Sequence, residues 1–325
     1  MVSGYYDDFT QIETERLADS AETSLKRMFE FLGFDLALDA HKDKRFSSKF
    51  TPLGMEVDLG ESQHGIVKLA PKPGRLSKVV ELCAEALSSD SLPVLSARSS
   101  GGVLRFLREG HFGRTGATVL KALTDHVQLG CEKGLQHDLR EGLEWVLCFL
   151  PVAPPRVISS SLSGQSASIF TDGAVDAERV TVGAVLFLPG SPPEAFGVEV
   201  PREVVSRWRT VDEEQVIAQA ELLLVLLSLL VWRVKLAGRY AVWWLDNDGA
   251  RQCLVHGYSK SMRNARLIDD TLLTMSIMST FSWYARVPTE CNIGDVSSRL
   301  EWEKLEAILP GTLRVIVTPE VWARV

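Results

Sequence analysis

The chain of 325 residues lacks the cysteine pattern of a disulfide framework or of a structural zinc site. Its five cysteines are odd in number, and no two of them form a CxxC pair. A recognisable signal peptide is missing, and the most apolar charge-free run, Leu222 to Trp232, has about half of the ~20 residues that a membrane-spanning helix needs. These absences favour a reduced intracellular protein of the cytoplasm or nucleus with no membrane segment, in which the apolar run is a buried helix.

Positive charge is also scarce. The 35 Lys and Arg are outnumbered by 42 Asp and Glu, and the net charge of −7 argues mildly against a nucleic-acid partner. However, residues 1–65 hold 13 acidic and 7 basic side chains, whereas residues 68–121 hold 4 acidic and 9 basic. This basic stretch either follows a phosphate backbone or is a solvated helix face, and charge alone does not decide between them. The candidate nucleic-acid contacts in it are Lys68, Lys72, Arg75, Lys78, Arg105 and Arg108.

A stretch rich in Pro, Ser and Gly, PVAPPRVISSSLSGQ at residues 151–165, predicts a linker. Before it, the apolar spacing predicts helices over residues 14–32, 75–87, 99–112 and 115–129. After it, the pattern predicts strands over residues 168–171, 180–188, 195–200, 240–245 and 283–287. Helices are expected between them, over residues 215–234, 249–255 and 265–279. The second half is therefore expected to be a mixed α/β sheet with flanking helices.

Four carboxylates occupy distinctive places in this pattern. Asp172 follows the first strand, Asp246 closes another strand (VWWLDNDGA), and Asp295 follows a strand and a turn. Glu221 lies in the apolar helix, where a buried carboxylate is costly unless it is paired or binds a metal. Each residue alone is also explained as a turn former, a helix cap or a polar residue at a helix margin. Together they indicate oxygen ligands for Mg²⁺, and paired Mg²⁺ ions drive phosphodiester hydrolysis.

The order strand–Asp, helix–Glu, strand–Asp and late Asp resembles the ribonuclease H-like domain of retroelement reverse transcriptases, over about residues 166–300. The segments LDNDGARQCLVHGYS and RVPTECNIGDVSSR carry the resemblance. In the closing motif Ile293 and Gly294 replace the usual Pro and Ala, and the motif residues that remain are Asn292, Asp295, Ser298 and Arg299. Many relatives also carry a mobile histidine before the last Asp. No His lies between His256 and Asp295 here, which places fast turnover in doubt.

The resemblance implies a five-stranded ribonuclease H-like sheet. It also implies an endonuclease that cuts the RNA strand of RNA–DNA hybrids and distinguishes RNA from DNA by the 2′-hydroxyls of RNA. It also implies two Mg²⁺ ions, with Mn²⁺ as a substitute. Their ligands and the catalytic residues would be Asp172, Glu221, Asp246 and Asp295.

The start of the chain, GYYDDF at residues 4–9, contains a YxDD tetrapeptide, for which an acidic turn is the ordinary explanation. A predicted helix, FLGF and FTPLGMEVDL follow, and this order resembles the end of a reverse transcriptase palm, with DIRS-like elements as the nearest comparison. The resemblance implies that Asp7 and Asp8 are polymerase metal ligands. The fingers and the other palm Asp do not fit into the preceding residues, so a truncated polymerase without DNA synthesis is expected.

The expected organisation is the C-terminal portion of such a reverse transcriptase. It has a palm remnant (1–65), a helical thumb/connection region (66–150), the linker (151–165), the ribonuclease H-like domain (166–300) and a C-terminal extension (301–325). The first hypothesis for its function is the hybrid-cleaving endonuclease. The alternative is a catalytically degenerate retroelement remnant that only binds nucleic acid, and a resolvase or exonuclease on the same fold is a third possibility. The sequence leaves the host and the oligomeric state open.

Overall fold

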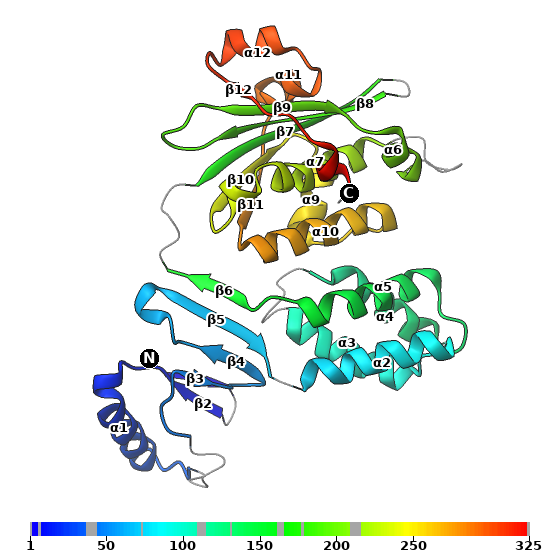
Figure 1. Cartoon of the computed structure of the whole chain (residues 1–325). Helices are drawn as coiled ribbons and strands as arrows, with labels where there is room; N and C mark the ends of the chain where they lie inside the picture. Colours follow the sequence, from blue (N-terminus) through cyan, green and yellow to red (C-terminus); the bar gives the residue numbers. More distant parts are fainter. Residues whose placement is uncertain are drawn as a thin grey trace.

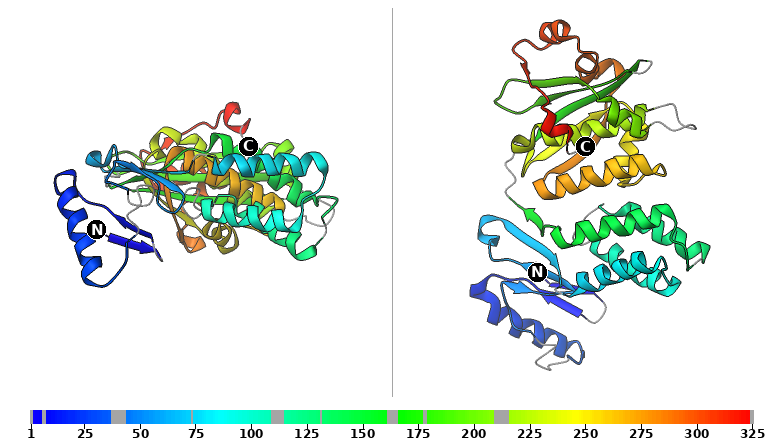
Figure 2. Two further views of the ribbon diagram at one scale, coloured as in Figure 1. Left: turned by 90° about the horizontal axis from the view of Figure 1, so that it is seen from below. Right: turned by 45° about the vertical axis from the view of Figure 1, so that its right-hand side comes forward.

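The computed structural model describes residues 2–5, 8–36, 44–72, 74–108, 115–130, 132–160, 166–176, 179–208 and 216–323. Figure 1 shows an elongated molecule, with the N-terminal elements at one end and a six-stranded sheet with its helices at the other. In both views of Figure 2 the N-terminal hairpin and helix lie apart from that sheet. No helix of the described part is long and apolar enough to cross a membrane.

The chain begins with a hairpin of β1 (Val2–Tyr5) and β2 (Asp8–Gln11), followed by α1 (Ala18–Phe31). Phe29 of α1 is buried and packs on Phe9, with ring centroids 4.5 Å apart. The helix predicted over residues 14–32 is confirmed, with its start at Ala18, and a hairpin precedes it. Their assignment to a polymerase palm remains a prediction.

A four-stranded antiparallel sheet follows, in the order β3 (Lys49–Phe50), β4 (Met55–Asp58), β5 (Ile66–Pro71) and β6 (Arg156–Ser159). Strand β6 lies within residues 151–165, where the prolines predict a linker. It pairs with β5, and Val157 lies opposite Lys68. The backbone N–H and C=O groups of this segment therefore have partners in the sheet, whereas in a linker they would be left to solvent. The stretch expected as a linker therefore includes a strand, and the sheet joins residues from both sides of the helical region.

The helical region is a bundle of α2 (Arg75–Ser89), α3 (Val94–Leu107), α4 (Ala117–Leu129) and α5 (His137–Phe149). Its core is formed by apolar side chains from all four helices, including Leu104, Leu123 and Leu143. The predicted helices over 75–87 and 115–129 are confirmed to within two residues. The helix predicted over 99–112 instead begins at Val94, directly after Pro93, whose fixed φ suits a helix start. A thumb or connection role for the bundle remains a prediction.

The C-terminal sheet contains β7 (Ala167–Asp176), β8 (Arg179–Phe187), β9 (Glu194–Glu199), β10 (Tyr240–Leu245), β11 (Phe281–Arg286) and β12 (Leu313–Arg314). The strand order is β11-β10-β7-β8-β9-β12. Strands β7, β8 and β9 are antiparallel neighbours, whereas β10 and β11 run parallel to β7. The five expected strands all form, but the prediction of a five-stranded sheet is wrong. The C-terminal extension returns to the exposed edge of β9 and adds β12 as a sixth strand.

One face of this sheet is covered by α7 (Ile217–Val231), behind which lie α9 (Asp248–His256) and α10 (Met262–Met278). Almost every side chain of α7 is buried in the main core, which confirms the prediction of a buried helix for the apolar run. The shorter helices nearby are α6 (Arg202–Trp208), α8 (Arg233–Leu236) and α13 (Pro319–Trp322). The other face carries α11 (Gly294–Ser298) and α12 (Trp302–Ile308), which pack on Val185 and Ala195.

Helix α10 joins the two halves of the molecule. Arg266 forms an ion pair with Glu141 of α5, and Leu273 packs against the core of the helical bundle. Asp269, only 6% exposed, lies beside Thr118 and the backbone of Gly116 at the start of α4. Burial raises the pKa of Asp269 to about 7, and the neighbouring Thr118 and Gly116 lower it by less than burial raises it. A carboxyl group that is costly to ionise therefore lies between the two halves.

Asp269→Asn is expected to stabilise the protein at pH 8.5 and to leave its stability at pH 4 nearly unchanged. Because the folded-state pKa is raised from the ordinary 3.8, the wild type loses stability as the pH rises through about 7, and the amide does not ionise. Urea unfolding at the two pH values measures the effect, which should reach a few kcal/mol at about 1.36 kcal/mol per pKa unit. An equal pH dependence of variant and wild type would contradict the prediction.

Candidate active site

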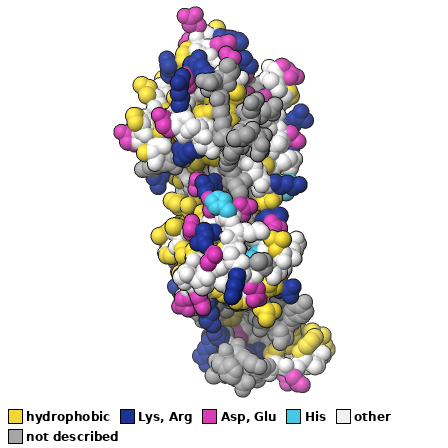
Figure 3. Space-filling model, turned by 90° about the vertical axis from the view of Figure 1, so that its right-hand side faces the viewer, with side chains coloured by type: hydrophobic (Ala, Val, Ile, Leu, Met, Phe, Trp, Pro, Cys, Tyr) yellow, Lys and Arg dark blue, Asp and Glu magenta, His cyan; other side chains and the backbone are white. Residues whose placement is uncertain are grey.

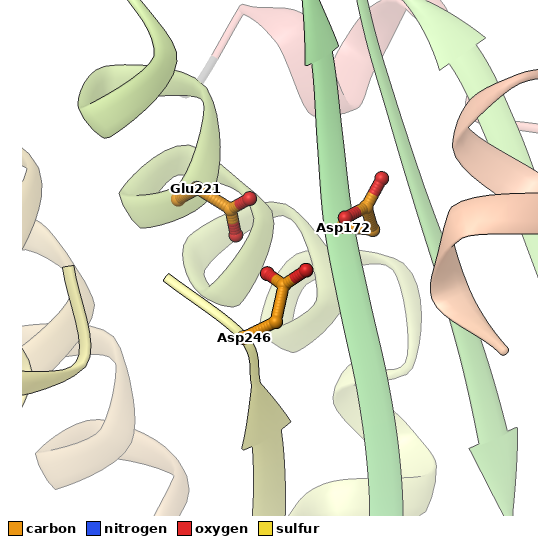
Figure 4. Close-up of side chains that lie close together, drawn as sticks. All are labelled: Asp172, Glu221 and Asp246. Atoms are coloured by element: carbon orange, nitrogen blue, oxygen red, sulfur yellow. The ribbon is translucent and has the colours of Figure 1, made fainter. Parts of the chain in front are cut away.

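Three of the four predicted carboxylates converge at one place in the C-terminal sheet. Asp172 projects from β7, Glu221 from α7 and Asp246 from the residue directly after β10, and Figure 4 shows their carboxyl groups turned towards one another. One ligand atom from each of the three lies within 4.8 Å of those of the other two. We refer to these three residues as the carboxylate triad.

Asp172 does not end its strand, contrary to the sequence prediction. Strand β7 continues to Asp176 because it pairs with β8 along its whole length, so that Asp172 is a mid-strand residue opposite Gly183. The neighbouring strand β10 is shorter, and its last pair with β7 joins Trp244 and Phe170. Beyond this pair, the side of β7 is not covered by a parallel neighbour. Asp246 follows β10 into this opening and lies close to Asp172 there.

Glu221 reaches the same opening from α7 on one face of the sheet. Its Oε1 accepts a hydrogen bond from the backbone N–H of Gly173 at 3.2 Å, which anchors the helix to β7 beside Asp172. Its Oε2 is buried and has no hydrogen-bond partner among the described residues. A buried carboxylate oxygen without a partner is costly, and a cation bound between the three carboxylates would supply the missing partner.

Burial and mutual repulsion raise the pKa values of the two buried members of the triad. For Glu221 burial is the main cause, the charges of Asp172 and Asp246 add to it, and the hydrogen bond from Gly173 opposes it, which together give a pKa of about 8. The metal-free protein therefore holds Glu221 largely protonated at neutral pH. A divalent cation would reverse this balance by favouring the ionised form.

Asp172 has a pKa of about 6, raised mainly by burial. A hydrogen bond from Ser298 lowers it, and the nearby charges of Asp246 and Asp295 raise it. The hydroxyl of Ser298 donates to Oδ2 of Asp172 at 2.6 Å. One of the two carboxylate oxygens of Asp172 is therefore held by the protein, and the other remains available to the triad.

Asp295, the fourth predicted ligand, lies outside the group of three. It occupies the first turn of α11, and its Oδ1 accepts a hydrogen bond from Nε of Arg299 at 2.8 Å. Its charge nevertheless contributes to the raised pKa of Asp172, so the two carboxylates are near each other. Asp295 is thus placed beside the triad but is paired with a cation of its own helix.

The residues present fit a hard divalent cation. The triad offers carboxylate oxygens, the ligand type that Mg²⁺ prefers, and one of these oxygens is buried without a partner. Within the part of the chain that the structure describes, no Lys or Arg forms an ion pair with a triad member, and the nearby Arg299 pairs with Asp295. The donor set is therefore of the type that could hold one Mg²⁺ ion between the three carboxylates, and Asp295 lies beside them.

The two acidic residues predicted at the start of the chain are not part of this site. Asp7 lies outside the described residues. Asp8 is the first residue of β2, opposite Tyr5 in the hairpin, which lies at the far end of the molecule from the C-terminal sheet. Their role as polymerase ligands stays a prediction.

The six predicted nucleic-acid contacts all belong to the lower half of the molecule in Figure 1, on β5, α2 and α3 or directly beside them. Lys68 forms an ion pair with Glu61, and the guanidinium of Arg75 lies 4.8 Å from the ring centroid of Phe106. Lys72, Lys78 and Arg105 are exposed. On the face drawn in Figure 3, Lys and Arg are mixed with Asp and Glu and do not gather into one basic patch.

No protein-family model and no curated protein matches the chain. Among solved structures, the chain is similar to ribonuclease H1 from the halophilic archaeon Halobacterium salinarum NRC-1, with 13% identity and a TM-score of 0.31 over 43% of this chain and 98% of that chain. It is also similar to the N-terminal RNase H domain of rv2228c from Mycobacterium tuberculosis, solved as a fusion with maltose binding protein. There the identity is 16% and the TM-score 0.32, over 45% of this chain and 99% of that chain.

A third similar structure is a foamy viral protease–reverse transcriptase in complex with double-stranded DNA. The identity is 12% and the TM-score 0.39, and the match covers 89% of this chain and 46% of that chain.

The sequence does not predict the contacts that two further residues of the site, Ser298 and Asn292, make with β7. Ser298 and Asn292 stand in the closing motif, but the motif alone does not say what their side chains contact. In the structure Ser298 binds Asp172, and Asn292 donates to the backbone carbonyl of Thr171 at 2.9 Å. The signal that could have identified them is that both are motif residues that remain on either side of a candidate ligand, Asp295.

Proposed function

We propose that the chain is a Mg²⁺-dependent nuclease of the ribonuclease H type, which hydrolyses the RNA strand of RNA–DNA hybrids. The observation that carries this proposal is the convergence of Asp172, Glu221 and Asp246, with ligand atoms within 4.8 Å of one another. Three carboxylates placed so closely disfavour one another's ionised forms unless a cation is shared between them. A shared hard cation is the simplest physical reason for building such a site.

Each carboxylate would have its own task in this mechanism. Asp172 and Asp246 are fixed by the sheet and would supply rigid ligand positions, whereas Glu221 is anchored through one oxygen and keeps the other for the cation. Asp295 would complete the ligand set for a second ion by exchanging its pairing with Arg299. When bound, paired Mg²⁺ ions lower the pKa of the attacking water and stabilise the departing 3′ oxygen, and Mn²⁺ can take their place.

We further propose that the chain is the C-terminal portion of a retroelement reverse transcriptase of the DIRS-like kind. The YxDD hairpin would be the end of the palm, and the bundle of α2–α5 would act as thumb and connection. The six basic residues on or directly beside β5, α2 and α3 would then hold the phosphate backbone of the hybrid, because cationic side chains provide most of the sequence-independent affinity for nucleic acid.

A second candidate function is supported by two specific observations. Asp295 is paired with Arg299, and the sequence has no histidine between His256 and Asp295. Both fit a retroelement remnant that binds nucleic acid without cutting it. In this case the triad would still bind a cation, but the RNA strand would stay intact.

The purified full-length chain tests the proposal on four end-labelled substrates, namely an RNA–DNA hybrid, single-stranded RNA, an RNA duplex and a DNA duplex. The expected result is Mg²⁺-dependent cleavage of the RNA strand of the hybrid, which EDTA abolishes. Cleavage of the DNA duplex would instead favour a resolvase or exonuclease. If the wild type binds Mg²⁺ and leaves all four substrates intact, the nuclease proposal fails and the remnant is favoured.

A further inference from the structure

Helix α11 lies directly on the backbone of the sheet, and two glycines allow this close approach. Gly183 of β8 and Gly197 of β9 lie opposite each other across the two strands. A Cβ atom at Gly183 would lie 2.2 Å from the backbone N of Ser298, and one at Gly197 would lie 2.1 Å from the carbonyl oxygen of Ser297. Both distances are far inside van der Waals contact, so any side chain at either position would hold α11 away from the sheet.

The same row of residues places Asp172 within reach of α11. Asp172 lies opposite Gly183 in β8, and Oγ of Ser298 lies 2.6 Å from its Oδ2 and 2.9 Å from the carbonyl oxygen of Asp295. The hydroxyl has one proton to donate, and an ionised carboxylate is a stronger acceptor than a carbonyl. The proton is therefore directed to Asp172. Ser298 is 0% exposed, so this hydrogen bond is shielded from bulk solvent.

A second tether precedes α11. The side chain of Asn292, 4% exposed, donates through Nδ2 to the carbonyl oxygen of Thr171 at 2.9 Å and accepts through Oδ1 from the N–H of Gly294 at 3.1 Å. The residues at the two ends of α11 are thus bonded to two consecutive residues of β7. Asn292, before the helix, bonds to Thr171, and Ser298, its last residue, bonds to Asp172. Asp295 lies between the two tethers, so its position beside the triad depends on both.

We propose that Ser298 is a positioning residue for the cation site. Its hydroxyl holds Oδ2 of Asp172, so that the other oxygen is presented to Glu221 and Asp246, and it couples Asp172 to the helix that carries Asp295. This proposal rests on the proposed nuclease function, because it concerns the same site. Without the hydroxyl, the carboxyl group of Asp172 is free to rotate, and this freedom must be lost whenever a cation binds.

The neighbouring residue provides a matched control. Ser297 is also 0% exposed and also lies on α11, and its Oγ donates to the carbonyl oxygen of Gly294 at 2.8 Å. Oγ of Ser298 lies at a similar distance, 2.9 Å, from the carbonyl oxygen of Asp295, three residues before it, but its proton is directed to Asp172. Ser297→Ala and Ser298→Ala therefore delete the same atom from the same short helix. Of the two hydroxyls, only that of Ser298 bonds to Asp172 in the described structure.

The test is calorimetric titration of the full-length chain with Mg²⁺ in the absence of nucleic acid. Ser298→Ala should bind Mg²⁺ about 10- to 100-fold more weakly than the wild type, as is usual when a residue that orients a ligand is lost. Ser297→Ala should bind as the wild type does. Both variants should unfold at similar temperatures without metal, and Ser298→Thr, which keeps the hydroxyl, should recover part of the affinity.

Equal Mg²⁺ affinities of the two alanine variants would overturn the positioning role while leaving the nuclease proposal intact. If the wild type itself does not bind Mg²⁺, the proposed function fails and the positioning role fails with it, so the two failures are distinguishable. Should Ser298→Ala not fold, Ser298→Cys gives the same comparison, because its somewhat larger thiol fills the position of the hydroxyl and is only a weak donor. Its affinity should then fall, and an unchanged affinity would overturn the proposal.

Discussion

Asp246→Asn should abolish Mg²⁺-dependent cleavage of the hybrid, lowering the rate at least ~100-fold, because losing a ligand costs no less than losing a residue that orients one. Asp246 is the triad member that is only partly buried, and it directly follows β10, so the isosteric amide should not disturb the fold. The amide lacks the negative charge that a cation requires of this position. Single-turnover cleavage of a labelled hybrid measures the loss, and unfolding by denaturant verifies the fold.

Asp248→Asn is the matched control for this experiment. Asp248 lies two residues further along the same loop, at the first position of α9, where its carboxylate is exposed and paired with Arg251 at 2.7 Å. Because it does not belong to the triad, its substitution should leave the cleavage rate within about twofold, the scatter of a surface change of ±0.5 kcal/mol. A similar loss of activity in both variants would contradict the assignment of Asp246 to the site.

Glu221→Gln should stabilise the metal-free protein at pH 9. The pKa of Glu221 is raised from the ordinary 4.5 to about 8 in the folded state. The wild type therefore has its full stability below about pH 4.5 and loses it as the pH rises through about 8, since the unfolded chain releases its proton first. The loss amounts to a few kcal/mol at about 1.36 kcal/mol per pKa unit, and the amide removes it. Chemical unfolding in EDTA from pH 4 to 9 measures this dependence.

Mg²⁺ should reverse the order of effects between the same two proteins, because it should stabilise the wild type more than Glu221→Gln. A ligand present at about 100 times its dissociation constant stabilises the folded state by about 2.7 kcal/mol, so Mg²⁺ should raise the melting temperature of the wild type at pH 8. Glu221→Gln should lose most of this gain. Asp269→Asn is the control, because Asp269 is a buried carboxyl with a raised pKa outside the triad, and it should keep the full gain. Equal stabilisation of Glu221→Gln and the wild type by Mg²⁺ would contradict the triad as a cation site.

Periodicity predicted the elements of the C-terminal half because each element has an unambiguous pattern. The run from Leu222 to Trp232 is too apolar for anything but a buried helix, and the apolar residues before Asp246 read as a strand buried on both faces. The carboxylates at Glu221 and Asp246 stand out against these runs because burying a charge without a ligand is costly. Two members of the triad could therefore be predicted with their structural setting.

The sequence identifies Asp172 as a candidate ligand but places it after its strand, whereas the structure places it within β7. The residues after it, GAVD, do not read as a strand alone, and they become one only through pairing with β8, which follows after a short turn. Strand β12 was missed for the same reason, since it contains two residues and exists only because β9 offers an open edge. Pairing between strands depends on the partner, so a single segment does not encode it.

The sequence by itself determined which residues could act: four carboxylates, three of them attached to strongly patterned strands or helices. It also determined that a buried Glu221 would need a partner. Only the tertiary structure decided that three of them share one opening and that the fourth pairs with Arg299, and it also decided that Ser298 holds Asp172. Burial costs and periodicity are local properties that a sequence carries. The meeting of β7, α7, β10 and α11 depends on strand register and on the close packing that Gly183 and Gly197 permit, which are properties of the assembled chain.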